Sequence, residues 1–310
     1  MHAELAGWLV VRIGSVSAHE ALQVVASLVH TTKTVRKGNV SLERAVEPLD
    51  TDDPERNTSR IRDWALWYLS IPEILNALKI TNQLESIKLE LQRPDGELRT
   101  VSVDAVGLSE NIDWVRPEPS NVATSPLYQR HPEKNFWVEY LEDEHVVYAK
   151  YNRVLSSKAN SIYRFRDELF ELIDDKQVDK FVIDVRNNGG GNNTLNRILL
   201  REIIIRNEEL NHRGTLFCII GRQTFSAAMN FVNSLEWWTN VIFVGEPTAG
   251  APNHFGDAET IRLPNSRLSG SVSTRYWQDS RPRETRPWIE PEIPVQLSSD
   301  DYRNNHDPAL

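Results

Sequence analysis

Cysteine and long apolar runs are scarce in this sequence of 310 residues. Cys218 is the only cysteine, and it lies inside an apolar stretch, so a disulfide framework is excluded and a buried, inert thiol is expected. No apolar run approaches the roughly 20 residues that span a bilayer. "GWLVVRIG" near the start is too short for this and lacks the flanks of a signal peptide. The chain is therefore expected to be soluble, without membrane insertion, and its compartment stays open.

Basic charge and metal-ligand clusters are scarce as well. Lysine and arginine number 35 against 44 aspartates and glutamates, which gives a net charge of -9. DNA, RNA and anionic membranes attract a basic footprint, so no nucleic-acid partner is expected. Histidine and cysteine never cluster at metal-ligand spacing. Neither a Gly-x-Gly-x-x-Gly fingerprint nor a P-loop occurs. We therefore predict no metal and no cofactor.

The first part of the chain is typical of a small β-rich domain. "GWLVVRIGSV" predicts a strand, "SAHEALQVVASLVH" and "PEILNAL" predict helices, and "TDDPERNTSR" (51–60) predicts a loop. "SIKLELQRPDGELRTVSVDAV" alternates apolar and polar residues on both sides of a Pro-Asp-Gly turn, which predicts a hairpin. "RPEPSNVATSP" then carries three prolines without periodicity. We place a first domain at 1–115, including a loop insertion, and a linker at 116–128.

Strands alternate with helices in the remaining domain, 129–310. The strand-like segments are "HVVYAKYN", "FVIDV", "TLFCII" and "NVIFVG", and the helical ones are "SIYRFRDELFELID", "TLNRILLREII" and "SAAMNFVNSL". This alternation indicates an α/β fold with a parallel sheet whose faces are covered. Ligands of such sheets bind where strands give way to helices.

Two of these junctions have unusual chemistry. "NNGGGN" lets the backbone approach a ligand and leaves N–H groups free to point outward, although a tight packing turn would also use glycine. "GRQTFSAAMN" places Ser226 where a helix begins. A serine there can simply cap the helix, or it can expose a nucleophilic Oγ beside the N–H of Ala227. Acyl transfer requires one nucleophile and two N–H donors that converge on one oxygen, which two adjacent strand ends can supply.

Several segments in fixed order resemble the tail-specific, or C-terminal processing, serine peptidase family. They are "FVIDVRNNGGGN", "IIGRQTFSAAMNF", "VIFVGEPTAGAPNHFGD", "IRLPNSRL" and "WIEPEIPV". The resemblance implies a Clp/crotonase-like spiral α/β core preceded by a PDZ-like domain, and a polypeptide substrate. By resemblance, Ser226 matches the nucleophile, and the N–H groups of Gly191 and Ala227 match the oxyanion hole. The same cleft would be lined by four further residues, Gly189, Gly190, Tyr151 and Asn152.

The general base is the open part of this resemblance. The best-known members use a lysine shortly after "GEPT", but Ala251 stands there and no lysine follows Lys180. The tricorn-like branch uses serine, histidine and glutamate instead, and Glu284 lies at about the place of the glutamate, with Glu290 as its competitor. That branch takes its histidine from sequence before the PDZ-like domain, and this chain starts too late to contain it. Among the histidines present, His254 after the "GEPTAGAPN" turn is the best candidate.

Three functions compete on this evidence. The first is a serine-type endopeptidase that forms an acyl-enzyme on Ser226, with weak or no activity if the base is missing, because an oxyanion hole alone sustains only residual catalysis. The second is a non-catalytic peptide- or lipid-binding protein on the same scaffold. The third, a crotonase-type acyl-CoA enzyme, lacks an evident nucleotide-phosphate site. The sequence does not determine the substrate, the cleavage preference or the oligomeric state.

Overall fold

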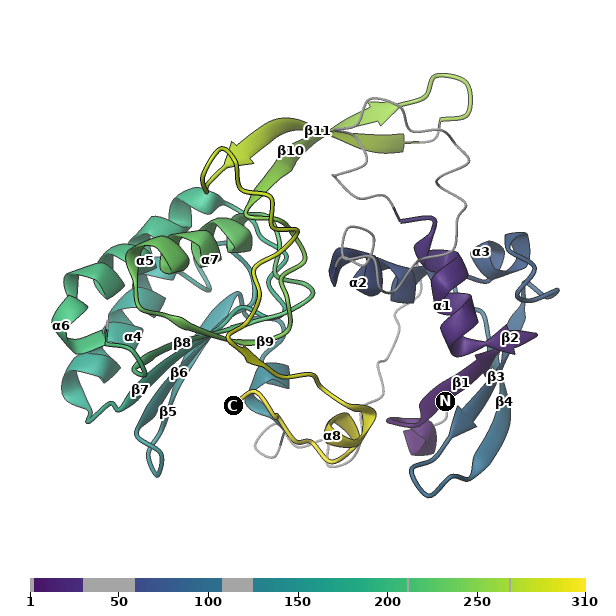
Figure 1. Cartoon of the computed structure of the whole chain (residues 1–310), viewed down its shortest axis with the longest axis horizontal. Helices are drawn as coiled ribbons and strands as arrows, with labels where there is room; N and C mark the ends of the chain where they lie inside the picture. Colours follow the sequence, from purple (N-terminus) through teal and green to yellow (C-terminus); the bar gives the residue numbers. More distant parts are fainter. Residues whose placement is uncertain (1–2, 30–58, 108–124, 211, 268) are drawn as a thin grey trace. The chain divides into compact units, whose positions relative to one another are not determined.

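The computed structural model describes residues 3–29, 59–107, 125–210, 212–267 and 269–310. These residues form two compact units (Figure 1). The four-stranded unit contains Ile61–Arg130 and Gln296–Leu310 with the described N-terminal residues, and the six-stranded unit contains His131–Val295. The predicted division into 1–115 and 129–310 stays a prediction, and the predicted linker 116–128 lies mostly outside the described residues.

The four-stranded unit is an antiparallel sheet with short helices. Its strands follow the order β2-β1-β3-β4, and the β3–β4 hairpin turns at Pro94–Gly96, as predicted. The Ser17 side chain caps α1 by accepting the Glu20 N–H at 3.1 Å. The elements are η1 (Ala3–Leu5), β1 (Leu9–Ile13), β2 (Val16–Ser17), α1 (Ala18–Ala26), α2 (Ser59–Tyr68), α3 (Pro72–Ala77), β3 (Ser86–Gln92), β4 (Leu98–Asp104), η4 (Leu127–Gln129) and α8 (Ser299–Arg303).

Helix α2 corrects the sequence prediction in this unit. The predicted loop over 51–60 lies outside the described residues except for Ser59 and Arg60, and those two residues already begin α2. The helix buries Ile61 and Ala65, four residues apart, in the core of the unit. Its apolar stripe is short and interrupted by charged residues, so periodicity gives only a weak signal there.

The six-stranded unit holds a mostly parallel sheet in the order β12-β9-β8-β7-β6-β5. Only β5 runs antiparallel to its neighbour β6, whereas the pairs from β6 to β12 are parallel. The elements are β5 (Phe136–Leu141), β6 (Val146–Tyr151), α4 (Ile162–Asp175), β7 (Lys180–Asp184), η5 (Asn193–Leu195), α5 (Asn196–Ile205), α6 (Asn207–Leu210), β8 (Leu216–Ile220), α7 (Ala227–Trp238), β9 (Ile242–Gly245), β10 (Asn253–Arg262), β11 (Ser269–Gln278) and β12 (Ile293–Pro294). The predicted mixed α/β fold is confirmed.

The three long helices α4, α5 and α7 lie on the same face of this sheet (Figure 1). Strands β6 to β9 are neighbours in chain order, so crossovers of one hand carry every connecting helix to one face. The apolar stripe of α4 that the sequence predicts, Ile162, Phe165, Leu169 and Ile173, is buried there. Among the described residues, α4 is the longest helix with 14 residues, and no helix has the length and apolar character required to cross a bilayer.

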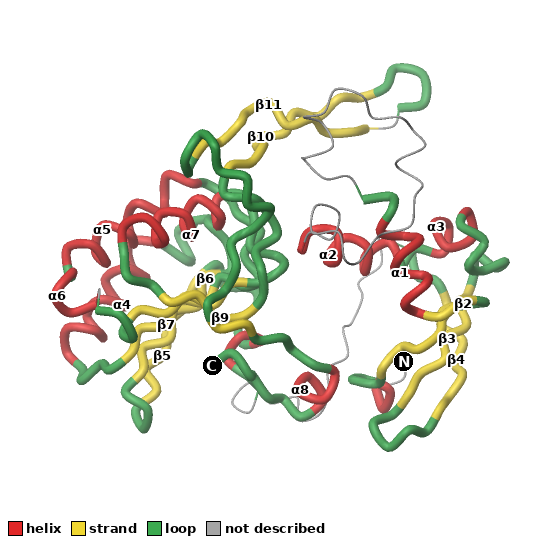
Figure 2. The backbone as a smooth tube through the Cα atoms, viewed as in Figure 1, coloured by secondary structure: helices red, strands yellow, loops and turns green. Residues whose placement is uncertain are grey.

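Two features of this unit matter later. Cys218 in β8 is fully buried, as predicted, and burial raises the pKa of its thiol well above the usual value, with a further contribution from the charge of Asp184. Strands β10 and β11 pair from Asn253↔Gln278 to Arg262↔Ser269 as one long two-stranded ribbon (Figure 2). The sequence analysis did not identify this hairpin.

Candidate active site

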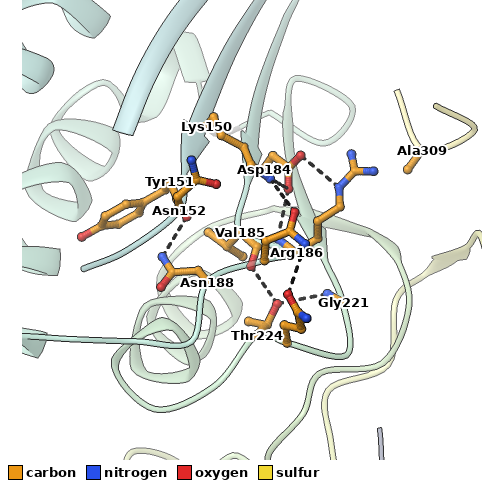
Figure 3. A network of polar contacts seen from close by, with 12 residues as sticks. Lys150, Tyr151, Asn152, Asp184, Val185, Arg186, Asn188, Gly221, Thr224 and Ala309 are labelled. Carbon is orange, nitrogen blue, oxygen red and sulfur yellow. Dashed lines mark hydrogen bonds and ion pairs between the residues drawn. The ribbon is translucent and has the colours of Figure 1, made fainter. Parts of the chain in front are cut away.

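The loops after β7 and β8 and the loop after β9 are bonded together at the carboxyl edge of the sheet. Thr224, which is fully buried, donates its hydroxyl proton to the carbonyl of Val185 at 2.9 Å (Figure 3). Its Oγ1 also accepts the N–H of Gly221 at 3.0 Å, and its carbonyl accepts the N–H of Ala249. These bonds fix the β8–α7 loop between its two neighbours, and Ser226 is the last residue of that loop.

Ser226 precedes α7 in a conformation that serine rarely adopts. Its backbone has φ 55° and ψ -125°, and its side chain makes no capping hydrogen bond. A non-glycine residue in such a region costs about 1–3 kcal/mol and is typically found at functional sites. A sharp turn between a strand and a helix is the kind of backbone that can present a serine Oγ at the top of a sheet, as in a nucleophile elbow. The Ser226 side chain therefore does not cap α7, which argues against the alternative that this serine is only a helix cap.

The glycine turn after β7 lies directly against Ser226. Gly190 has φ 109°, and a Cβ at that position would lie 2.7 Å from Ser226 Cβ and 2.9 Å from the nitrogen of Ala227. Gly191 has φ 140°, and a Cβ there would lie 2.3 Å from the carbonyl oxygen of Val154. Gly189, by contrast, has no atom within 4 Å of such a Cβ. Two of the three glycines are thus required by the close approach of the backbone.

Backbone N–H groups of this turn and of α7 differ in their partners. The Gly190 N–H donates to Asn188 Oδ1 at 2.9 Å. Within the described residues, the N–H groups of Gly191 and Ala227 have no acceptor. Gly191 is exposed, and Ala227 opens α7, where the first N–H groups have no partner inside the helix and carry a partial positive charge. Two donors are therefore available beside Ser226.

Asn188 is a residue of this site that the sequence analysis missed. It is fully buried, its Nδ2 donates to the carbonyl of Tyr151 at 2.8 Å, and its own carbonyl accepts the N–H of Phe225 at 3.0 Å (Figure 3). Asparagine immediately before consecutive glycines favours turns in which its side chain bonds the backbone two residues on. That local signal is present in "NNGGG" and could have identified it.

Tyr151 and Asn152, which the sequence analysis placed in the cleft, make hydrogen bonds within the protein. Tyr151 is 1% exposed, its hydroxyl donates to Asn196 Oδ1 at 3.1 Å, and burial raises the pKa of the phenol. Its ring packs edge-on against Phe231 of α7. Asn152 is half-buried and donates from Nδ2 to the carbonyl of Lys134 at 3.0 Å. The side chain of Tyr151 thus lies in the core, where it does not present a surface to a substrate.

His254 is placed beside the serine loop. It lies at the start of β10, is 2% exposed, and its ring centroid is 5.8 Å from that of Phe225. Phe225 immediately precedes Ser226, so the structure brings this predicted base next to the turn that carries Ser226.

Glu284 forms an ion pair with Arg286. Arg286 donates to Glu284 Oε2 at 2.9 and 3.0 Å and reaches Glu236 of α7 with two further bonds at 2.8 and 3.0 Å. The hydrogen bond from Arg286 lowers the pKa of Glu284 against the opposing effect of burial. Glu236 lies about 14 Å along α7 from Ala227 at about 1.5 Å per residue. Glu284 is therefore tied to the distant end of the helix, and its competitor Glu290 is exposed and accepts the indole N–H of Trp288.

The last residue of β7, Asp184, is a buried carboxylate paired with two basic side chains. Asp184 is fully buried, with one oxygen 3.0 Å from Lys150 Nζ and the other 2.9 Å from Arg186 Nε (Figure 3). Burial alone would raise the pKa of Asp184, but the charges of Arg186 and Lys150 and the 2.6 Å hydrogen bond from Tyr148 lower it to about 2. Because Lys150 is paired with a carboxylate, this lysine does not supply the amine base that the sequence lacks after Lys180. Among the described residues, no group of three or more His, Cys, Asp and Glu side chains could hold a metal ion.

Comparison with known proteins identifies the fold. No family model and no curated protein matches this sequence. The structure of mature CPAF complexed with lactacystin is similar over 96% of this chain and 75% of the other, with a TM-score of 0.54 and 13% identity. A mutant of CPAF is similar over 96% and 74%, with a TM-score of 0.52 and 14% identity. The photosystem II D1 C-terminal processing protease reaches a TM-score of only 0.38 at 14% identity, over 69% of this chain and 56% of its own. The likeness to CPAF establishes a shared fold.

Proposed function

We propose that this chain is a serine-type peptidase that hydrolyses polypeptides through an acyl-enzyme on Ser226. The observation that carries the proposal is the strained, uncapped serine that lies against a glycine turn. Two N–H groups, those of Gly191 and Ala227, are available there to form an oxyanion hole. The fold that the chain shares with the peptidase CPAF supports the same reaction class, although the fold alone does not determine function.

The reaction follows from these groups. Ser226 Oγ attacks the carbonyl carbon of the scissile bond and gives its proton to a base, while the carbonyl oxygen takes up negative charge in front of the two N–H donors. The C–N bond then breaks, the amine leaves with the proton, and water later hydrolyses the ester. We assign the base to His254, because its ring lies beside the residue that precedes Ser226. Glu284 stays a prediction as the orienting carboxylate, since Arg286 holds it in an ion pair.

The substrate side of the proposal rests on the four-stranded unit. We propose that this unit is PDZ-like and captures chain ends by strand addition, with specificity from neighbouring pockets. The six-stranded unit would correspond to the Clp/crotonase-like core of a tail-specific peptidase. A small antiparallel sheet with accompanying helices is compatible with strand addition, because no other described strand pairs with the outer edges of β2 and β4.

Intact-mass detection of a fluorophosphonate adduct tests the proposal most directly. We expect one adduct on the wild-type chain and none on Ser226→Ala. Ser234→Ala is a matched control, because it removes a hydroxyl from the same helix, where Ser234 Oγ only donates to the carbonyl of Asn230 at 2.8 Å. That variant should keep the adduct. An adduct that survives in Ser226→Ala, or a wild-type chain that neither forms an adduct nor cleaves an unfolded protein, would contradict the proposal.

A further inference from the structure

We propose that Asn188, Tyr151 and Asn196 form a buried positioning relay that holds both N–H donors of the oxyanion hole in register. The inference rests on the proposed function, because it assigns roles to residues that support the donors of that site. Tyr151, at the end of β6, is the centre of the relay. Its carbonyl leads to the glycine turn and its hydroxyl leads to the start of α7.

The first arm runs from Tyr151 to the glycine turn. Asn188 donates from Nδ2 to the Tyr151 carbonyl at 2.8 Å and accepts the Gly190 N–H on Oδ1 at 2.9 Å. One amide side chain thus fixes the peptide that links Gly189 to Gly190. The carbonyl of Gly190 is also held, since it accepts the N–H of Val154 at 2.9 Å. The C=O of Gly190 and the N–H of Gly191 belong to one planar peptide and point in opposite directions. Because the C=O points toward Val154, the N–H of Gly191 points away from it.

The second arm runs from Tyr151 to α7. The Tyr151 hydroxyl donates to Asn196 Oδ1 at 3.1 Å, and Asn196 Nδ2 donates to the carbonyl of Ala227 at 2.7 Å. Asn196 is 4% exposed and lies at the start of α5. This arm holds the first residue of α7, whose N–H is the second donor. Asn188 also accepts the Phe225 N–H, so it restrains the turn on the other side of Ser226 as well.

Burial makes the relay rigid. Asn188, Tyr151 and Asn196 are 0, 1 and 4% exposed, so a lost partner is not readily replaced by bulk water. A buried polar group that loses its partner keeps the full cost of its desolvation, which keeps each bond closed. Donors held in place before the reaction need not reorganise when charge develops on the carbonyl oxygen. Misplacement of about 1 Å can cost on the order of 100-fold in rate, so the relay should affect turnover more strongly than binding.

Each arm has a matched control elsewhere in the six-stranded unit. Tyr151→Phe removes only a hydroxyl, and Tyr140→Phe removes one that donates to the carbonyl of Gln177. Asn188→Ala removes an amide bonded to backbone groups, and Asn160→Ala removes one bonded to the N–H groups of Asn135 and Phe136 and to the Phe136 carbonyl. The control pairs therefore lose similar bonds, but not around Ser226.

The test measures kcat and KM for a p-nitrophenyl ester and for its thiono analogue, together with the unfolding midpoint. Sulfur is larger than oxygen and accepts hydrogen bonds weakly, so a well-formed oxyanion hole discriminates strongly between the two substrates. We expect Tyr151→Phe and Asn188→Ala to lower kcat for the ester by about tenfold to 100-fold. KM should stay within about twofold, and the preference for the ester over the thiono ester should fall. Tyr140→Phe and Asn160→Ala should change none of these ratios.

Unchanged kcat and an unchanged ester preference in Tyr151→Phe would overturn the relay, whatever happens to the unfolding midpoint. If Asn188→Ala does not fold, the Tyr151→Phe and Tyr140→Phe pair decides alone. A wild-type chain without Ser226-dependent hydrolysis would instead refute the proposed function, so the two failures are distinguishable.

Discussion

Gly190→Ala should disable the candidate site while its neighbour Gly189→Ala should not. The new methyl would lie 2.7 Å from Ser226 Cβ, 2.9 Å from the Ala227 nitrogen and 3.0 Å from the Phe225 carbonyl oxygen. Carbon atoms pack best at about 3.5–4.0 Å, so Ser226 would have to move by about 1 Å. The φ of 109° adds strain of about 1–3 kcal/mol for a residue with a Cβ.

We therefore expect Gly190→Ala to lower the free energy of unfolding by about 2–6 kcal/mol, from the left-handed strain and overpacking together. The rate of fluorophosphonate labelling should fall by about 100-fold, because misplacement of about 1 Å has that effect on a reacting group. Urea unfolding and time-resolved intact mass measure the two quantities. Gly189→Ala is the control, since nothing lies within 4 Å of its Cβ and its φ is outside the left-handed range. If both variants label and unfold alike, the glycine turn does not approach Ser226 as described.

The remaining predictions concern charged groups. Burial raises the pKa of Asp279 above its ordinary 3.8, so the native state binds the proton more tightly than the unfolded chain, and stability should fall as pH rises from 3.8 through the native value. Asp279→Asn should remove that part of the pH dependence in urea melts, and an identical slope would contradict it. The pKa of Asp184 is shifted in the opposite direction, since it is lowered to about 2 in the native state. Its stabilisation is present above the unfolded value and lost as pH falls through the native value. Asp184→Ala leaves Lys150 buried without its carboxylate and should cost about 3–5 kcal/mol, whereas a loss below about 1 kcal/mol would show that the pair is not buried. Arg286→Ala breaks two partly exposed ion pairs, with Glu236 and Glu284, and should cost at most about 1 kcal/mol for each. It should leave Ser226 labelling unchanged, and a large loss of labelling would mean that Glu284 does serve the site.

Local signals in the sequence were sufficient for the parallel sheet and its helices. Short apolar strands such as "FVIDV" alternate with segments of helical period, and each of these corresponds to an observed element. The spacing of apolar residues follows from which side of a helix is buried, so each residue of the apolar stripe of α4 could be predicted from the sequence. The β10–β11 ribbon was missed because its residues beyond the first four pairs, counted from Asn253 and Gln278, are exposed. An exposed ribbon has no buried face, and hence no alternation of apolar and polar residues.

The candidate site was predictable only where the chain itself dictates the geometry. Ser226 and the glycines lie at strand ends, and their conformations follow from the turns they occupy. Tyr151 donates to Asn196, and Arg286, which pairs with Glu284, also donates to Glu236; both Asn196 and Glu236 come from distant parts of the chain. No spacing in the sequence encodes those contacts. Which tyrosine lies in the core, and that Arg286 reaches α7, are decided by tertiary packing alone.

The lone thiol in β8 has a practical consequence. Cys218 is sealed in the core with a strongly raised pKa, so a thiol reagent can react with it only after the sheet opens. Its strand leads into the loop that carries Ser226. In a large excess of reagent, the labelling rate of Cys218 in the unmodified protein would therefore report how often the sheet opens locally at β8. Comparison of this labelling rate in the presence and absence of an inhibitor bound to Ser226 would measure how strongly occupancy of the candidate site stabilises the sheet that supports it.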